Sequence, residues 1–258
     1  MGIKELQETW DQLGSDDPMW AVLVEPGKEG RKWNREEFFD SGRADIAAIM
    51  DLAQEQNIEV KFGTALDFGC GLGRLSQALA EHFEQVDGVD IAPSMIEQAS
   101  VLNSHGTRVR YHLNGKSDLS QFESKYFDFV FTALVLQHMP QKLQLGYMAE
   151  FMRILKSGGT AVFQAVLHNP NPEGVRPIKK LVRNMMSREV RRIYWSTRNR
   201  LSAGGLATLL KSGMDMYTLD ESEIENVVRL GGGSIVYKSL EPRCTGDWIG
   251  QYYWVLKA

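Results

Sequence analysis

A glycine-rich loop between a short apolar strand and a helix constrains this sequence more than any other stretch. Residues 64–74 read TALDFGCGLGR, which predicts a buried strand over 65–68 and a helix over 74–82. The loop glycines allow positive φ and let the backbone approach a ligand closely. A strand, a glycine loop and a helix start together form a backbone site for a ligand.

The spacing of the loop glycines decides which ligand is favoured. A dinucleotide-binding fingerprint has glycines at its first, third and sixth positions. Here these positions are Gly69, Gly71 and Arg74, and an arginine at the sixth disfavours close helix packing beside a pyrophosphate. The pattern D-x-G-x-G-x-G, from Asp67 to Gly73, instead resembles motif I of class I S-adenosylmethionine (SAM) methyltransferases. That resemblance implies that the loop cradles the methionyl end of the cofactor.

A second strand, predicted over 85–90, ends on an acid. Asp90 lies 21 residues after Gly69, near the offset of a carboxylate that accepts hydrogen bonds from a ribose diol. A charged acceptor suits two hydroxyl donors. The alternative is a turn aspartate that precedes Pro93.

Further motifs extend the resemblance over residues 60–165. The stretch 127–140, FDFVFTALVLQHMP, is similar to the family's motif after strand four, and 156–163, KSGGTAVF, to its entry into strand five. Ile91 and Met95 are expected to flank the adenine. By resemblance, the loop at Asn114 and Gly115 lies near it; the family commonly has an aspartate in that loop, and this chain has its acid at Asp118. The implied cofactor residues are Asp67, Gly69, Cys70, Gly71, Gly73, Arg74, Asp90, Ile91, Met95, Asn114, Gly115, Thr132, Ala133 and Leu134.

Helices and strands alternate along the rest of the chain, which predicts a parallel sheet with helices on both faces and ligands at the carboxyl ends of the strands. Asp220 and Glu223 form a capping box for a late helix. The fold prediction is a three-layer, doubly wound α/β fold with a mostly parallel seven-stranded sheet and an antiparallel last strand. The other predicted elements are helices at 1–13, 41–54, 93–102 and 141–155, the last ended by glycines, and strands at 109–113, 127–132, 160–167 (apolar throughout), 234–240 and 251–256.

The chain is expected to divide into four segments. These are a helical cap (1–58), a SAM-binding Rossmann-like core (59–169), a helical lid (170–212), and a helix with two strands that complete the core (213–258). The cap either closes over the cofactor or packs on the sheet edge.

The expected lid carries a basic amphipathic stretch. Residues 176–200 contain nine lysines and arginines and one acid, Glu189, in a chain of net charge −4. The stretch is either a solvated face of a packing helix or a surface that recognises an anionic substrate, RNA or a membrane.

Two histidines follow strands at the predicted ligand edge. His138 and His168 are the candidate bases for an oxygen acceptor; for His138 the alternative is a helix-entry residue bonded to backbone. Tyr194 and Trp195 either line an aromatic acceptor pocket or pack.

Composition excludes several classes of protein. Cys70 and Cys244 form no metal-binding spacing and no disulfide framework, so we expect no metal and a reducing, cytoplasmic location. No apolar run is long enough to span a membrane, and a net charge of −4 disfavours a nucleic-acid partner.

The function prediction is a SAM-dependent methyltransferase that acts on an oxygen or nitrogen of a small, anionic or aromatic molecule. The alternatives are an RNA or protein methyltransferase that uses the basic lid, a non-enzymatic SAM-binding protein, and a nucleotide oxidoreductase, which Arg74 disfavours.

Overall fold

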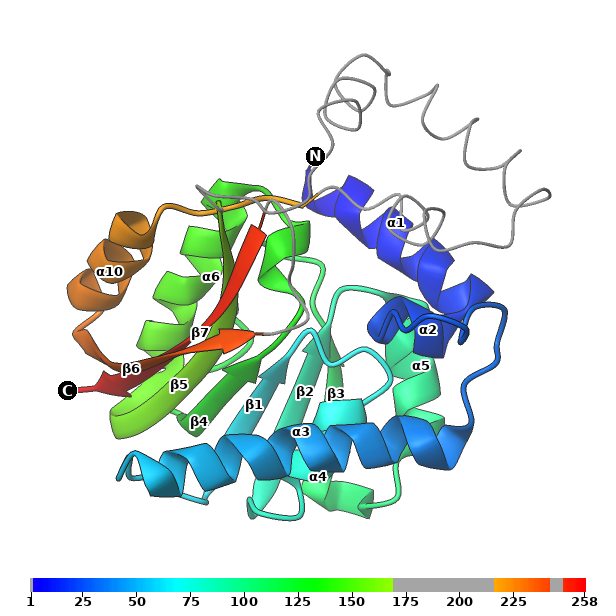
Figure 1. Ribbon diagram of the computed structural model, residues 1–258, viewed down its shortest axis with the longest axis horizontal. Coiled ribbons are helices and arrows are strands. Elements are labelled where there is room, and N and C mark those ends of the chain that lie inside the picture. Colours follow the sequence, from blue (N-terminus) through cyan, green and yellow to red (C-terminus); the bar gives the residue numbers. More distant parts are fainter. Residues whose placement is uncertain (1, 169–215, 242–247) are drawn as a thin grey trace.

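The computed structural model describes residues 2–168, 216–241 and 248–258 (Figure 1). The predicted lid, its basic stretch 176–200 and Cys244 lie outside these residues. The helices are α1 (Ile3–Asp16), α2 (Pro18–Val22), α3 (Arg35–Glu55), α4 (Arg74–Leu79), α5 (Pro93–Leu102), α6 (Gln141–Ile154) and α10 (Glu221–Leu230), with single 3₁₀ turns η1 (Gly106–Arg108) and η2 (Leu136–His138). The strands are β1 (Thr64–Phe68), β2 (Gln85–Asp90), β3 (Val109–Leu113), β4 (Phe127–Thr132), β5 (Leu155–His168), β6 (Gly233–Glu241) and β7 (Trp248–Lys257).

One sheet of seven strands runs through the described residues, in the order β3-β2-β1-β4-β5-β7-β6. Strands β1 to β5 pair in parallel, and β7 is antiparallel to both of its neighbours. The order reverses between β1 and β4, so a crevice for a ligand is expected at the carboxyl ends of these two strands. The predicted sheet is thereby confirmed.

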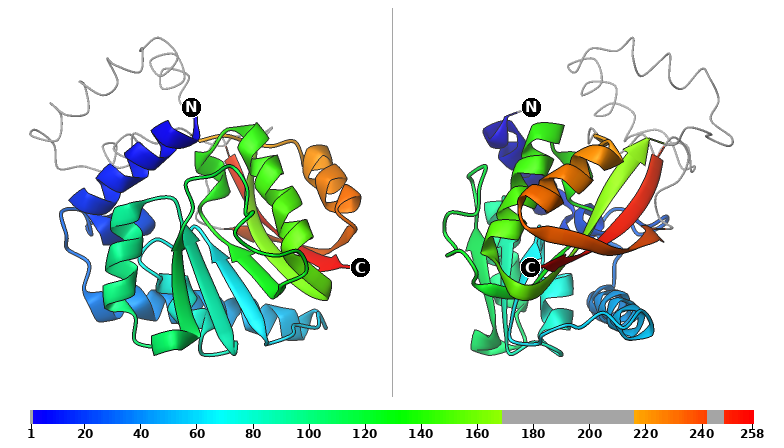
Figure 2. Two further views of the ribbon diagram at one scale, coloured as in Figure 1. Left: turned by 180° about the vertical axis from the view of Figure 1, so that it is seen from behind. Right: turned by 90° about the vertical axis from the view of Figure 1, so that its left-hand side faces the viewer.

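Both faces of the sheet are covered, because consecutive strand residues point to opposite faces. On one face, Leu66 and Val130 pack with the buried residues of α6 and α10. On the other, Ala65 and Phe129 pack with α3 and α4. Figure 2 shows α3 on the side of the sheet opposite α6 and α10.

Four element predictions were wrong in detail. The helix predicted from residue 41 begins at Arg35, because Asn34 Oδ1 accepts the Glu36 and Glu37 N–H groups at 2.9 and 3.2 Å. Helix α4 stops at Leu79, three residues short. The glycines at 158–159 do not end a helix: the chain is already extended from Leu155. The C-terminal strands are longer than expected.

The N-terminal segment crosses the carboxyl side of the strands (Figure 1). Gln98 of α5 donates through Nε2 to Gly14 O at 3.0 Å, and Asp11 Oδ1 accepts the Ser94 N–H at 2.8 Å. Since Ala92, the N-cap of α5, contributes no side-chain hydrogen bond, Asp11 caps α5 from another helix. Trp20, Trp33, Phe38 and Phe39 then form an apolar cluster with Leu72, Ala92 and Met95. Helices α1 and α2 therefore lie at the carboxyl ends of the strands, while α3 packs on one face of the sheet.

Three polar contacts hold α4, and so the end of the glycine loop, in place. Asp67 of β1 is buried and accepts the Ser76 hydroxyl at 2.6 Å. Arg74, also buried, pairs with Asp45 of α3 at 2.8 Å and donates to Ser41 Oγ at 3.2 Å. These contacts join the end of the loop to β1 of the sheet through Asp67 and to α3 through Arg74.

Removing the cap that α1 gives α5 should loosen α1. Asp11→Ala leaves the Ser94 N–H without its acceptor, so we expect a loss of about 1 kcal/mol in the free energy of unfolding and faster hydrogen exchange across α1. Asp11→Asn keeps an acceptor and is the control. Urea denaturation and amide exchange that match the wild type for Asp11→Ala would show that the contact does not hold α1.

The buried Asp67 should make stability depend on pH. Burial raises the pKa of Asp67 from 3.8 to about 6, against the lowering effects of Ser76 and Arg74. The folded state therefore keeps a proton that the unfolded state releases, and stability falls as pH rises from about 4 to about 6. Asparagine at position 67 does not ionise. The free energy of unfolding of Asp67→Asn, relative to that of the wild type, should therefore rise by about 3 kcal/mol between pH 4 and pH 7. Parallel pH profiles of the two proteins in urea denaturation would contradict this.

Candidate functional site

The glycine loop turns through three left-handed residues. Gly69, Gly71 and Gly73 have φ of 78°, 51° and 79°, a region that other residues enter only at a cost. A Cβ at Gly69 would collide with Val135, and one at Gly73 with the Tyr111 hydroxyl. The loop needs glycine at these positions for its backbone angles and for the space.

Most amides of this loop are already bonded within the protein. Gly69 and Cys70 donate to Val89 O at 2.7 and 3.0 Å, Gly73 donates to Cys70 O at 2.8 Å, and Gly71 donates to Asp90 Oδ2 at 2.8 Å. A phosphate-binding loop points such N–H groups at its anion. This loop does not offer these four, so its geometry disfavours a pyrophosphate.

Asp90 stands beside the loop at the end of β2. Its Oδ2 accepts from Gly71 and its Oδ1 accepts the Ala92 N–H at 2.9 Å. Burial raises the pKa of this carboxyl, and the backbone hydrogen bonds from Ala92 and Gly71 oppose that shift. Each carboxylate oxygen can accept a second hydrogen bond, so both oxygens remain available to a pair of hydroxyl donors.

The loop after β4 contains a strained residue. Leu134 has a φ of 63°, which costs an L-residue roughly 1–2 kcal/mol. Its N–H donates at 2.6 Å to Oε1 of Gln164, which is fully buried in β5. Backbone strain of this kind is concentrated at functional sites. Gln164 therefore holds the loop in the shape that a ligand at the end of β4 would meet.

Beside Leu134, Thr132 presents a hydroxyl group that a ligand could satisfy. Its side chain is buried, and its Oγ1 has no hydrogen-bond partner among the described residues. Buried polar atoms of native proteins are almost always paired. Ala133 follows it, half-buried, at the same edge of the sheet.

The polar groups at the predicted adenine side form hydrogen bonds within their own loop. Asn114 is buried, and its Nδ2 donates to Asp118 O at 3.0 Å. Asp118 Oδ1 accepts the Ser120 N–H at 3.0 Å, and Gly115 packs against Gln7 of α1. Ile91 is half-buried, and Met95 lies in the apolar cluster beneath α1 and α2.

Arg74 and Cys70 contribute to the site mainly through their backbone. The Arg74 guanidinium faces α3, away from the loop, in the ion pair with Asp45. The Cys70 thiol is buried, and burial raises its pKa, so it stays protonated. Neither side chain offers charge to a ligand over the loop.

Both candidate bases lie at the carboxyl edge. His138 ends η2, and its ring packs edge-on against the Trp10 ring of α1, with ring centres 5.2 Å apart. The backbone N–H of His138 donates to Val135 O at 3.0 Å. His168 is the exposed last residue of β5 and pairs with Trp248 of β7. Contact with α1 thus gives His138 a packing role alongside any chemical one.

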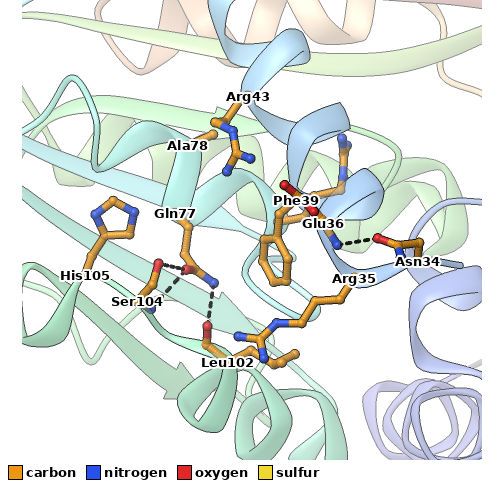
Figure 3. Close-up of a pocket in the computed structure, with 11 residues that line it drawn as sticks. Asn34, Arg35, Glu36, Phe39, Arg43, Gln77, Ala78, Leu102, Ser104 and His105 are labelled. Carbon is orange, nitrogen blue, oxygen red and sulfur yellow. Dashed lines mark hydrogen bonds between the residues drawn. The ribbon is translucent and has the colours of Figure 1, made fainter.

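A cavity of about 400 Å³ lies elsewhere, between the start of α3, α4 and the segment after α5 (Figure 3). Gln77 spans it, donating to Leu102 O at 3.2 Å and accepting from Ser104 Oγ at 2.7 Å. Arg43, one of its lining residues, pairs with Asp40. No loop glycine lines this cavity, so it is not the site at the strand ends.

Within residues 2–168, 216–241 and 248–258, no helix is long and apolar enough to cross a membrane. The same residues contain no group of three or more His, Cys, Asp or Glu side chains that could hold a metal ion.

Sequence reasoning missed Gln164 and Gln7. The sequence analysis expects an apolar strand over 160–167, although Gln164 inside it is a visible signal for a buried polar contact. Gln7 stands on the helical face of Ile3 and Trp10, four and three residues away, and a polar residue on that apolar face was the sequence signal for a specific contact.

Comparisons with known proteins agree with this geometry. Residues 66–163 match the family model of a methyltransferase domain. A ubiquinone biosynthesis O-methyltransferase of Hydrogenovibrio crunogenus is 33% identical over 119 residues, which cover 46% of this chain and 48% of that protein. The enzyme of that name in Pseudomonas fluorescens is 28% identical over 171 residues, covering 59% of this chain and 72% of the relative. The chain spans about half the length of the first of these relatives.

Solved structures share the fold over almost the whole chain. The magnesium protoporphyrin IX methyltransferase of Synechocystis, with bound S-adenosylhomocysteine, superposes with a TM-score of 0.60 at 18% identity, covering 99% of both chains. Phosphoethanolamine N-methyltransferase 1 of Haemonchus contortus gives 0.59 at 15% identity and covers 100% of this chain and 50% of its own. Residues 66–163 thus match a methyltransferase domain, and the chain has the class I SAM-dependent methyltransferase fold that its motifs predict.

Proposed function

We propose that this protein is an enzyme that transfers the methyl group of SAM to a small molecule, with an oxygen as the first choice of acceptor atom. The observation that carries the proposal is the Asp90 carboxylate beside a glycine loop whose amides are bonded internally. The Asp90 carboxylate can accept hydrogen bonds from a ribose, and the bonded loop amides offer no donors to a phosphate. The O-methyltransferase names of the sequence relatives support an oxygen acceptor, while a nitrogen acceptor remains the second choice.

The residues present fit the cofactor from its methionyl end to its ribose. Thr132, Ala133 and Leu134 would hold the methionyl end, where the buried Thr132 hydroxyl has no partner among the described residues. The backbone from Gly69 to Gly73 would lie beneath the centre of the cofactor, and Asp90 would accept the ribose hydroxyls. SAM supplies an electrophilic methyl group on a sulfonium, and the protein's task is to align the acceptor in line with it and to exclude water.

The acceptor would approach over the ends of β4 and β5. His138 and His168 are the side chains there that could remove a proton from an acceptor hydroxyl. The four segments 1–58, 59–169, 170–212 and 213–258 are retained as part of this proposal, as is a reducing, cytoplasmic setting.

The cofactor preference can be measured directly. We expect SAM or S-adenosylhomocysteine to bind with a dissociation constant of about 1 μM or below, roughly −8 kcal/mol, and NAD to bind far more weakly. Asp90→Ala should weaken SAM by about 1.5–3 kcal/mol, because charged hydrogen bonds are lost. Titration calorimetry checks both.

Matched variants separate binding from folding. Glu97→Ala removes an exposed acid from α5 and should leave SAM affinity unchanged. Because Asp90 also accepts from Gly71 and Ala92, a urea denaturation of Asp90→Ala must accompany the titration. NAD binding that equals or exceeds SAM binding would contradict the proposed cofactor. An unchanged SAM affinity in a folded Asp90→Ala protein would contradict the proposed role of Asp90.

The acceptor class has its own test. With radiolabelled SAM, label should pass to hydroxylated small aromatic molecules, including anionic ones, and not to RNA or protein. Label found only in RNA or protein would overturn the small-molecule assignment and favour the basic stretch as a macromolecular surface.

A further inference from the structure

The side chain of Gln7 lies where the ends of β2 and β3 meet the N-terminal helix. Its Nε2 donates to Ile91 O at 2.9 Å. A Cβ built on Gly115 would lie 3.4 Å from Nε2 and 3.8 Å from Oε1 of the same amide. The amide thus touches the residue after Asp90 and the residue after Asn114, although α1 is some 80 residues or more away in sequence.

The orientation of this amide is fixed by its neighbour. A carbonyl oxygen can only accept, so the NH₂ group of Gln7 must face Ile91 O and the Oε1 atom must face the other way. Oε1 has no hydrogen-bond partner among the described residues. Half-buried acceptors that lack a partner in the protein are available to a ligand.

The neighbouring loop does not offer this acceptor through its first side chains. Asn114 Oδ1 accepts the Lys116 N–H at 3.3 Å, and its Nδ2 is bonded to Asp118 O. Gly115 has no side chain, and Asp118 caps the Ser120 N–H. The polar groups after β3 therefore hold their own loop together.

A ribose on Asp90 determines where its base must go. The base lies one strand further along the sheet edge, over the ends of β2 and β3, and adenine carries an exocyclic amino group that needs an acceptor. Resting on the proposed function, we propose that Oε1 of Gln7 accepts from the adenine amino group. The N-terminal helix, held by Asp11 and Ser94, thereby recognises the base of the cofactor.

The proposal can be tested without turnover, using S-adenosylhomocysteine and S-inosylhomocysteine as probes in titration calorimetry. Inosine replaces the amino donor with a carbonyl acceptor, which would face Oε1 across an unfavourable contact. We expect the wild type to prefer the adenosyl probe by about ten-fold or more. Gln7→Leu should bring that ratio close to one, and Gln7→Glu, which keeps an acceptor, should retain a preference.

Gln12→Leu is the matched control, because Gln12 lies on the same helix and bonds only the exposed Asp16. It should keep the wild-type ratio. A Gln7→Leu protein that loses affinity for both probes equally would make Gln7 a tether for α1, and one that gains affinity for both would make it a plug; either result overturns the proposal. Failure of the wild type to bind S-adenosylhomocysteine would instead overturn the proposed function.

Discussion

The carboxyl ends of the strands depend on one half-buried carboxylate, that of Asp90. Asp90 ends β2, accepts the Gly71 N–H with one oxygen and the Ala92 N–H with the other, and so joins the glycine loop to the start of α5. The Val89 carbonyl, one residue earlier, accepts two more loop amides. With its donors bonded in this way, the loop keeps three left-handed glycines in one shape before any ligand binds, which reduces the ordering cost of binding.

Helix α1 of the N-terminal segment contacts several residues at the carboxyl ends of the strands. Asp11 caps α5 from α1, Gln7 reaches Ile91, and Trp10 packs against His138. One helix therefore touches the connection after β2, the connection after β3 and the turn after β4. An element that contacts all three strand ends can couple the cofactor side of the crevice to its acceptor side, since any shift of α1 moves contacts on both.

The parts of the fold and of the site that could be predicted from the sequence are those that depend on interactions between neighbouring residues. The strand, loop and helix around Gly69 carry their signal in adjacent residues, and the alternation of elements fixed the parallel sheet. Asn34 capping α3 was missed because any of several polar residues could have begun that helix. Gln7 and Gln164 act through partners 84 and 30 residues away, and no local pattern names such a partner. Arg74 was predicted as a cofactor residue from its place in the motif, but its pair with Asp45 of α3 is visible only in three dimensions.

The electrostatics of the loop also bear on the choice of ligand. Asp67 and Asp90 are two acids beside the same loop; burial is the main cause that raises the pKa of Asp67, and the charge of Asp90 raises it further. The Arg74 charge, which lowers that pKa, is paired with Asp45. A pyrophosphate would bring two further negative charges into this setting, without the free amides or guanidinium that usually compensate them. A sulfonium brings a positive charge, which both carboxylates favour in a partly buried site where charge interactions are weakly screened. The same arrangement that makes Asp67 costly to ionise would thus stabilise a cationic cofactor.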